Sequence, residues 1–582
     1  MLRVFVVVCL VTSAWGEMER VESRIVKIKQ GSVRGYKAPG DNFFVFHSIP
    51  YATAPTGSHR YKEPLPPPVW TNIYEAVNRG IVCPQFGFGL GLKEDKEAKE
   101  DCLHANIYVP DTKEKKLPVL VYVHGGAYLL GYAELVKPKQ LANTKKAIIV
   151  NFNYRLGPHG FLCLGTQDIP GNAGMKDMVA LLRWVKDNIA SFGGNPDDVT
   201  VAGYSAGSSA VDLLQLSKMA DNLFNKVIPE SGANTAAFSV QADPLAIAKR
   251  VAKKLKFNNV DDIDALEEFY KTASYELLTS VNLMDELDST FTFSPCVERD
   301  TGVEIFLDDS PVNILKSGKY QKRPMLYGFA NMEGLFRINY FEQWKDKMNT
   351  KLSDFLPADL HFDSESEKEK IATKVKKFYF GGKPVGSENI LGFVDFFSDV
   401  IFAYPTLRSV RLQVENGNDQ IYLYEYAYTD DDTPEIPYTN VRGANHCAQT
   451  MVVHDGLNIT HTDESKLTNS MKNMKKMLRE MWLNFVTTGK PVPEGSSLPA
   501  WLPTGANGSP YMSLNSKPEL MDVPMLSKRV QFWDKIYDQY YRHPTPPNPS
   551  PSKLSNRFTS YLIVFIFIYI YEELITNLNQ KI

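Results

Sequence analysis

The amino-acid sequence predicts an α/β fold with a large, mostly parallel central sheet and helices on both of its faces. Two continuous apolar runs, 117–123 and 147–152, are bounded by turn residues and are typical of strands buried inside a parallel sheet. Between Met175 and Ala190 the apolar residues recur at helical spacing. Strands and helices that alternate along a chain form a sheet covered by helices on both faces.

The N-terminal segment 1–16 predicts a secretory signal peptide. Arg3 supplies the positively charged N-terminal region of such a peptide, Val4 to Val11 form its apolar run, and 14–16 form a small-residue cleavage site. A buried strand of the mature fold is the less favoured interpretation. An exported chain folds where disulfide bonds form, and Asn458 and Asn507 are then candidate glycosylation acceptors.

One large domain, 17–541, is expected to follow. Its first elements are predicted to be the antiparallel strands of 25–34 and 43–46. The length of 582 residues would allow about four average domains, but large α/β sheets exceed that average within one domain. No internal repeat, heptad run or long linker interrupts the sequence before residue 542.

The C-terminal segment 542–582 is predicted to be a Pro-rich linker followed by a short apolar tail. The Pro- and Ser-rich residues 543–555 are typical of an extended, flexible linker. The apolar run 561–571 is much shorter than the roughly 20 residues that a helix needs to cross a bilayer. Glu572 and Glu573 follow it, whereas a lipid-anchor signal would end in its apolar tail. We therefore favour a soluble protein, with membrane association through the tail as the alternative.

The charge balance argues against nucleic acid as a partner. The net charge is −3 and the isoelectric point is near 6.4. No basic cluster is interleaved with aromatic residues, as an RNA- or DNA-binding surface would require.

The most informative segment is 192–207, which ends in the G-x-S-x-G pattern Gly203–Gly207. The β-branched run 199–201 predicts a strand that enters this turn, and the small and apolar residues of 208–216 predict a helix that leaves it. A serine on such a turn is presented as a nucleophile, so Ser205 is the candidate. The segment resembles the serine signature of the type B carboxylesterases, the family that also contains the cholinesterases and the insect esterases.

The resemblance covers nearly the whole mature domain, because short landmarks of the family occur in a fixed order. The segment 100–110 is similar to the second family signature. The other landmarks are 49–52, 153–158, 171–177, 482–485 and 488–491. The resemblance implies the α/β-hydrolase fold.

Five cysteines remain after removal of the signal peptide. The resemblance implies a disulfide between Cys83 and Cys102, which would stabilise the fold by about 3 kcal/mol in the chain-entropy description. Cys163, Cys296 and Cys447 are an odd remainder, so at least one free thiol is expected. Their pairing stays open.

The general base is the next group that ester hydrolysis requires. His446 follows Gly443 by three residues, which resembles the family loop that carries the catalytic histidine. His454 and His461 lie close by but lack this setting. The residue three positions after the histidine is usually an acid in the family, and here it is Gln449.

The acid that orients this base is expected between the nucleophile and the histidine in chain order. The segment 327–334 resembles the family segment that carries a glutamate, which implies Glu333. Its carboxylate would accept a hydrogen bond from one ring nitrogen of His446 and leave the other nitrogen facing Ser205.

Backbone donors for the oxyanion are predicted in the glycine-rich segment that follows the 117–123 strand. By position in the family motif, Gly126 and Ala127 donate, together with Ala206 after the nucleophile. Most relatives carry glycine at the position of Ala127, and its methyl group restricts the backbone dihedrals.

Aromatic residues give partial information on the substrate. Phe238 and Phe291 fall where the family places acyl-pocket side chains, although a role as general core aromatics is equally consistent with the sequence. No tryptophan lies between Cys83 and Cys102, so the cation–π contact that cholinesterases use there is missing. Tyr204 differs from the Glu of cholinesterases and from the Gln typical of juvenile hormone esterases.

We therefore predict a secreted serine carboxylesterase that acts on small to medium apolar carboxylic esters, in general, xenobiotic or odorant ester degradation. No metal or organic cofactor is expected. The alternatives are a juvenile hormone esterase-like enzyme and a non-catalytic, cholinesterase-like adhesion module. Adhesion relatives usually lose a member of the triad, whereas this chain keeps all three.

Overall fold

The structure is a computed structural model of the chain. It describes residues 22–548 with the exception of 79, 87–95, 285 and 457–463. The predicted signal peptide 1–16, the candidate acceptor Asn458 and the apolar run 561–571 lie outside the described residues.

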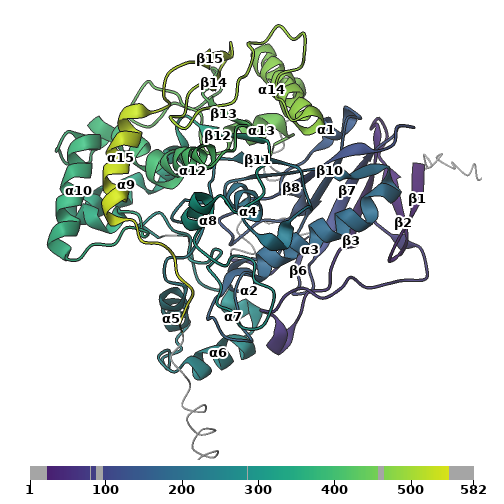
Figure 1. The fold of residues 1–582 in the computed structure, drawn as a ribbon, viewed down its shortest axis with the longest axis horizontal. Helices are drawn as coiled ribbons and strands as arrows, with labels where there is room; N and C mark the ends of the chain where they lie inside the picture. Colours follow the sequence, from purple (N-terminus) through teal and green to yellow (C-terminus); the bar gives the residue numbers. More distant parts are fainter. Residues whose placement is uncertain (1–21, 79, 87–95, 285, 457–463, 549–582) are drawn as a thin grey trace, which may run out of the picture.

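Within the described residues, a thirteen-stranded sheet forms the centre of the fold, in the order β1-β2-β3-β7-β9-β8-β10-β11-β12-β13-β14-β15 with β4 beside β2 (Figure 1). From β9 to β14 every neighbouring pair is parallel, and antiparallel pairs occur only towards the two edges. The prediction of a mostly parallel central sheet is confirmed. The strands are β1 (Glu22–Ile28), β2 (Gly31–Lys37), β3 (Phe43–Pro50), β4 (Tyr74–Glu75), β7 (His104–Pro110), β8 (Leu117–Val123), β9 (Ile148–Phe152), β10 (Gly194–Tyr204), β11 (Lys226–Glu230), β12 (Met325–Ala330), β13 (Ile421–Tyr426), β14 (Tyr511–Leu514) and β15 (Glu519–Met521), and β5 (Ile81–Val82) pairs with β6 (Glu97–Ala98) separately.

Both faces of the sheet are buried, which explains why the central strand β8 carries no charged or amide side chain. Val119 and Val121 of β8 belong to one core cluster and Leu120 and Tyr122 to a second, because successive side chains of a strand point to opposite faces. The first cluster includes residues of α3 (Ala173–Asn188) and α4 (Ala206–Leu214). The second includes residues of α1 (Lys139–Asn143) and α14 (Asn469–Thr488).

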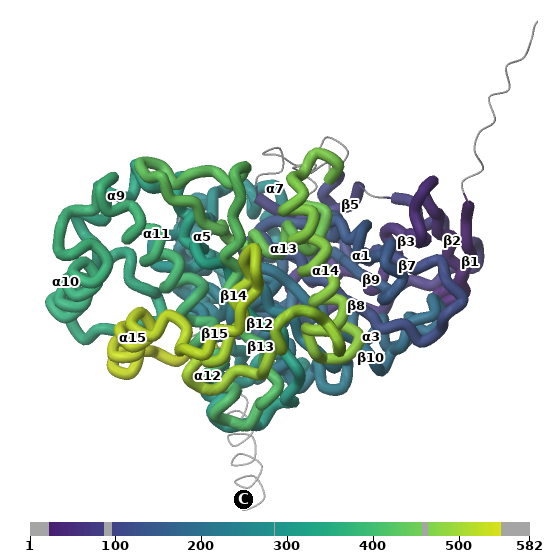
Figure 2. Tube along the Cα trace, turned by 90° about the horizontal axis from the view of Figure 1, so that it is seen from above, coloured from purple at the N-terminus to yellow at the C-terminus, as the bar shows by residue number. Residues whose placement is uncertain are grey.

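A helical region extends beyond the sheet on the side away from the N-terminal strands. Seen from above, β1 to β3 lie at one end of the protein and α9, α10 and α15 at the other (Figure 2). The remaining helices are α2 (Gly157–Phe161), α5 (Pro244–Lys254), α6 (Ile263–Thr272), α7 (Tyr275–Leu278), α8 (Pro311–Ser317), α9 (Phe341–Lys351), α10 (Glu365–Phe380), α11 (Ile390–Ser398), α12 (Tyr404–Glu415), α13 (Ala448–Val453) and α15 (Ser527–Tyr540).

One helical stretch of the described chain, 387–415, is long and apolar enough to cross a membrane, and 83% of its apolar window is buried inside the protein. Its side chains contribute to the main core, with Phe393 and Phe402 both fully buried. The stretch is therefore part of the protein core.

Two disulfides cross-link the described chain. Cys83 is bonded to Cys102, as the family resemblance implies, and Cys163 is bonded to Cys296 across 133 residues of sequence. Cys447 is a free, buried thiol, which agrees with the expectation that one of the three remaining cysteines is unpaired.

The first residues of the predicted linker pack against the domain, which differs from the free, flexible segment that their composition predicts. His543 Nδ1 and Ser310 Oγ are hydrogen bonded at 2.8 Å. Pro544 and Pro547 are buried, and Pro547 lies so close to Gly165 that a Cβ atom on that glycine would be 2.8 Å from it. Composition favours an extended backbone here, but the proline rings gain by burial against the domain surface.

Candidate active site

Ser205 occupies a sharp turn between β10 and α4. Its backbone dihedrals are φ 56° and ψ −124°, outside the regions that non-glycine residues usually adopt. The flanking glycines are required by space. A Cβ atom at Gly203 would lie 2.5 Å from the Gly207 carbonyl oxygen, and one at Gly207 would lie 2.3 Å from the Val123 carbonyl oxygen. The G-x-S-x-G pattern is thus explained by the crowding of this turn against the end of β8.

Glu333 and His446 are in contact, although 113 residues separate them in sequence. Glu333 lies just after β12 and is fully buried. Its Oε1 accepts hydrogen bonds from the Ala330 amide at 2.7 Å and from Ser231 Oγ at 2.5 Å, and its Oε2 accepts one from His446 Nδ1. A carboxylate held in this way fixes the tautomer of the imidazole, so that Nε2 is left as an acceptor.

Two aromatic rings hold the His446 imidazole from its sides. Phe402 stacks on it with ring centroids 4.2 Å apart, and Phe336 lies at 5.1 Å. The side chain of His446 is 10% exposed. Packing and the Glu333 contact therefore fix both the plane of the ring and the direction of Nε2.

The sulfur of Cys447 lies 3.3 Å from His446 Nε2, the nitrogen that would receive a proton from Ser205. Burial raises the pKa of the Cys447 thiol well above its ordinary value, and the nearby Glu333 and Glu230 charges raise it further. The thiol therefore stays protonated and donates a hydrogen bond to Nε2. Ser205 Oγ has no hydrogen bond to His446 or to any other described residue.

The segment after β8 approaches the nucleophile closely. A Cβ atom at Gly125 would lie 3.0 Å from the Ser205 Cβ. Gly126 has φ 115° and Ala127 has φ 58°, and neither of their amides donates a hydrogen bond within the described chain. Ala206 is the first residue of α4, where the backbone amide has no partner inside the helix. All three predicted oxyanion donors thus lie on the two segments that meet at Ser205, and their amides are available.

A second buried carboxyl, which the sequence analysis did not single out, lies behind the nucleophile. Glu230 ends β11, and its backbone oxygen accepts the Ser205 amide at 2.8 Å. Its carboxyl accepts hydrogen bonds from Tyr122 Oη at 2.9 Å, Trp482 Nε1 at 2.9 Å and Thr450 Oγ1 at 3.2 Å. Burial raises the pKa of Glu230 to about 7, against the opposite effect of these three donors.

Gln449 takes part in the same network. Its Nε2 donates to Ser231 Oγ at 2.7 Å, and Ser231 in turn donates to Glu333. The amide at this position can donate without carrying a charge, so the departure from the family's usual acid is accommodated by a continuous chain of hydrogen bonds.

The carboxylesterase family model matches residues 22–533, nearly the whole described chain. The chain belongs to the carboxylesterase family. It is 31% identical over 549 residues to a juvenile hormone esterase of Heliothis virescens, with 90% of this chain and 96% of that protein aligned. It is 31% identical over 514 residues to esterase FE4 of Myzus persicae, with 83% and 87% aligned. The crystal structure of juvenile hormone esterase from Manduca sexta, with OTFP covalently attached, superposes with a TM-score of 0.78 at 28% identity and covers 89% of this chain and 100% of its own.

Membership establishes the α/β-hydrolase fold and the activity class: the protein is a carboxylic ester hydrolase. The predicted family and fold are confirmed. No group of three or more His, Cys, Asp or Glu side chains in the described part of the chain is arranged to hold a metal ion.

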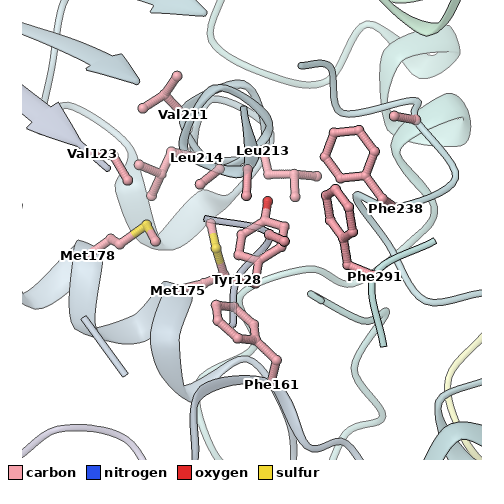
Figure 3. Packing of buried hydrophobic residues seen from close by; sticks show 14 of the residues in the cluster. Val123, Tyr128, Phe161, Met175, Met178, Val211, Leu213, Leu214, Phe238 and Phe291 are labelled. Atoms are coloured by element: carbon pink, nitrogen blue, oxygen red, sulfur yellow. The ribbon is translucent and has the colours of Figure 1, made fainter. Parts of the chain in front are cut away.

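The predicted acyl-pocket residues lie together in this carboxylesterase. The rings of Phe238 and Phe291 are 4.8 Å apart and almost fully buried, and Figure 3 shows them side by side next to Leu213 and Tyr128. Phe238 also contacts Phe402, the ring that stacks on His446, at 5.9 Å. An aromatic surface therefore connects these two residues to the base.

Proposed function

We propose that the protein hydrolyses carboxylic esters through Ser205 as nucleophile, His446 as general base and Glu333 as the group that orients the base. Nε2 of His446 removes the Ser205 proton while the oxygen attacks the ester carbonyl. The amides of Gly126, Ala127 and Ala206 stabilise the negative charge that develops on the carbonyl oxygen.

The alcohol then leaves with the proton held on His446, and an acyl-enzyme remains on Ser205. Water, deprotonated by the same nitrogen, attacks the acyl carbonyl and releases the acid. No step requires a metal or an organic cofactor.

The single observation that carries the proposal is the contact of His446 Nδ1 with the buried Glu333, because it leaves Nε2 as an acceptor. The strained turn at Ser205 and the free amides beside it support the same roles. The missing bond between Ser205 and Nε2 is consistent with a resting state, since catalytic hydrogen bonds often form only when substrate is bound. The Cys447 thiol is a weak hydrogen-bond donor, so the Ser205 hydroxyl, a stronger donor, would replace it as the partner of Nε2.

For the substrate we propose small to medium apolar esters, with the acyl part against Phe238 and Phe291. Aromatic rings bury apolar area without requiring a charged partner. A juvenile hormone esterase-like specificity is the second candidate, and the Heliothis virescens and Manduca sexta relatives favour it. Turnover of an epoxy terpenoid methyl ester would distinguish the two.

We further propose that the protein is secreted. The apolar N-terminal segment and the two disulfides support export, since disulfides persist in oxidising compartments. Asn507 is exposed, as a glycosylation acceptor must be.

The deciding experiment compares the wild type with Ser205→Ala and His446→Ala on short phenolic esters and with a phosphonylating inhibitor. Each substitution should lower kcat by several orders of magnitude, because members of a triad act as a unit. The inhibitor should modify the wild type once, on Ser205, and leave Ser205→Ala unmodified. A wild type that neither hydrolyses the esters nor takes up the inhibitor would support the adhesion-module alternative.

A further inference from the structure

A cavity of about 230 Å³ lies beside the predicted acyl pocket, between the start of α5 and the segment that carries Phe291. We call it the α5 cavity. It reaches the surface at Ala246 of α5, which is exposed, and Phe291 forms part of its inner wall. Ser205, His446 and Phe238 do not line it. The α5 cavity is therefore separate from the catalytic site, but it shares the Phe291 ring with the predicted acyl pocket.

Apolar atoms make up most of the surface of the α5 cavity. Apart from Phe291, its apolar lining consists of four alanines and one isoleucine: Ala237, Ala242, Ala246, Ala358 and Ile247. Alanine side chains are short, so several of them in one place leave space that larger side chains would fill. Such a surface binds carbon chains by removing them from water.

The charged residues around the α5 cavity already have partners. Asp243 caps the start of α5, and Asp288 accepts a hydrogen bond from Thr290 Oγ1 at 2.5 Å. Arg250 forms an ion pair with Glu286 at 2.9 Å. A charged molecule would have to break one of these contacts, whereas an uncharged carbon chain would leave all of them in place. The α5 cavity thus favours an apolar occupant.

Hydrogen bonds fix the inner wall of the α5 cavity at Gln241. The Nε2 atom of this residue donates to the carbonyl oxygen of Phe161 at 3.0 Å and to that of Ser294. The Phe291 ring, by contrast, is held by packing, against Phe238 with ring centroids 4.8 Å apart (Figure 3). The Phe291 ring is therefore the part of this wall that can turn.

We infer that the α5 cavity is a subsite for the distal carbons of medium-chain acyl groups, which enter it when the Phe291 ring turns aside. The predicted acyl pocket ends at Phe238 and Phe291, which is sufficient for a short acyl group. A longer chain that continues past Phe238 meets Phe291 and, behind it, the α5 cavity. The inference rests on the proposed function, because that function places the acyl group against these two rings.

The dependence of kcat/KM on acyl chain length reports whether the α5 cavity is used. Each methylene group that enters the cavity should raise kcat/KM by a few-fold, because its apolar area leaves water. An acetyl group is too short to pass Phe291 and gains nothing from the cavity. The informative quantity is therefore the ratio of kcat/KM for p-nitrophenyl decanoate to kcat/KM for p-nitrophenyl acetate.

The first test blocks the mouth of the α5 cavity in the full-length protein. Ala246→Trp adds a large ring at an exposed helical position, where it does not strain the core. We expect the decanoate-to-acetate ratio to fall by about four-fold or more, the value of one buried methylene group. Lys253→Trp is the matched control, because Lys253 is an exposed residue of the same helix that does not line the cavity. Its ratio should equal that of the wild type.

The second test opens the wall between the acyl pocket and the α5 cavity. Phe291→Ala removes the separating ring and should raise the decanoate-to-acetate ratio by about four-fold or more. Adding Ala246→Trp to Phe291→Ala should remove most of this gain, because two residues that act through one cavity are coupled. Phe291→Leu replaces the alanine variant if that variant does not fold.

Two results would overturn the inference. One is an equal decanoate-to-acetate ratio in Ala246→Trp and in the wild type. The other is a gain in Phe291→Ala that persists in the combined variant, which would show that the longer chain lies elsewhere. Either result, with acetate still hydrolysed, would refute the inference alone. A protein that hydrolyses neither ester and takes up no phosphonylating inhibitor would refute the proposed function, and this inference with it.

Discussion

Glu230 gives the sharpest test of the electrostatics around the nucleophile. This carboxyl is fully buried and its pKa is raised to about 7 by burial. Because the folded protein holds the proton more tightly than the unfolded chain, the group favours folding below the unfolded pKa, near 4.5. That contribution is lost as the pH rises through about 7.

The perturbation is Glu230→Gln, which keeps the shape and an acceptor oxygen but cannot titrate. With the pKa at 4.5 in the unfolded chain and about 7 in the fold, ionisation of Glu230 costs the wild type about 2.5 kcal/mol more at pH 8 than at pH 5. The variant does not carry this cost. The free energy of unfolding of Glu230→Gln, relative to the wild type, should therefore rise by about 2.5 kcal/mol between these two pH values.

The assay is guanidinium unfolding of both proteins, followed by tryptophan fluorescence at several pH values with the disulfides intact. All other titrating groups are common to the two proteins and cancel in the difference. Glu494→Gln, at an exposed site, is the control and should give a difference independent of pH. A flat difference for Glu230→Gln between pH 5 and pH 8 would refute the raised pKa and the burial argument behind it.

Substitutions at three further places test the scaffold of the site. Gly207→Ala would place its Cβ 2.3 Å from a backbone carbonyl oxygen, so we expect loss of ester hydrolysis with a lowered melting temperature, measured by calorimetry. Arg155→Leu leaves Asp177 buried without its cation and should cost about 3–5 kcal/mol in the free energy of unfolding, whereas Arg155→Lys should cost less. Removing the disulfide with Cys163→Ala and Cys296→Ala releases a 133-residue loop and should lower the free energy of unfolding by about 5 kcal/mol, with little change in KM.

The parts of this carboxylesterase that the sequence predicts well are those set by local pattern. The run 117–123 is β8 along its whole length, and the strand and helix expected around Ser205 are β10 and α4. Burial on both faces makes β8 a continuous apolar run, and the crowded turn between β10 and α4 demands its glycines. Each of these signals is readable within about ten residues of sequence.

Contacts between distant segments are not readable in this way. Glu230 could be taken for an ordinary strand end, because its three donors come from three other elements. The pairing of Cys163 with Cys296 could not be deduced from spacing, since an odd set of three cysteines allows several pairings. Cys447 follows His446 directly, but the sequence shows neither the left-handed backbone at that residue nor the contact of its sulfur with the imidazole.

The end of β11 explains how the nucleophile and the base are held in one frame. The Glu230 backbone oxygen accepts a hydrogen bond from the Ser205 amide. Its carboxyl accepts a hydrogen bond from the Thr450 hydroxyl of α13. The hydroxyl of the next residue, Ser231, accepts a hydrogen bond from Gln449 of the same helix and donates one to the acid Glu333. Helix α13 is too short to be stable alone, so these two adjacent bonds fix its first turn, and the base His446 lies two residues before its first residue, Ala448. Substitution of either partner should therefore change the position of the base relative to Ser205 before it changes the fold.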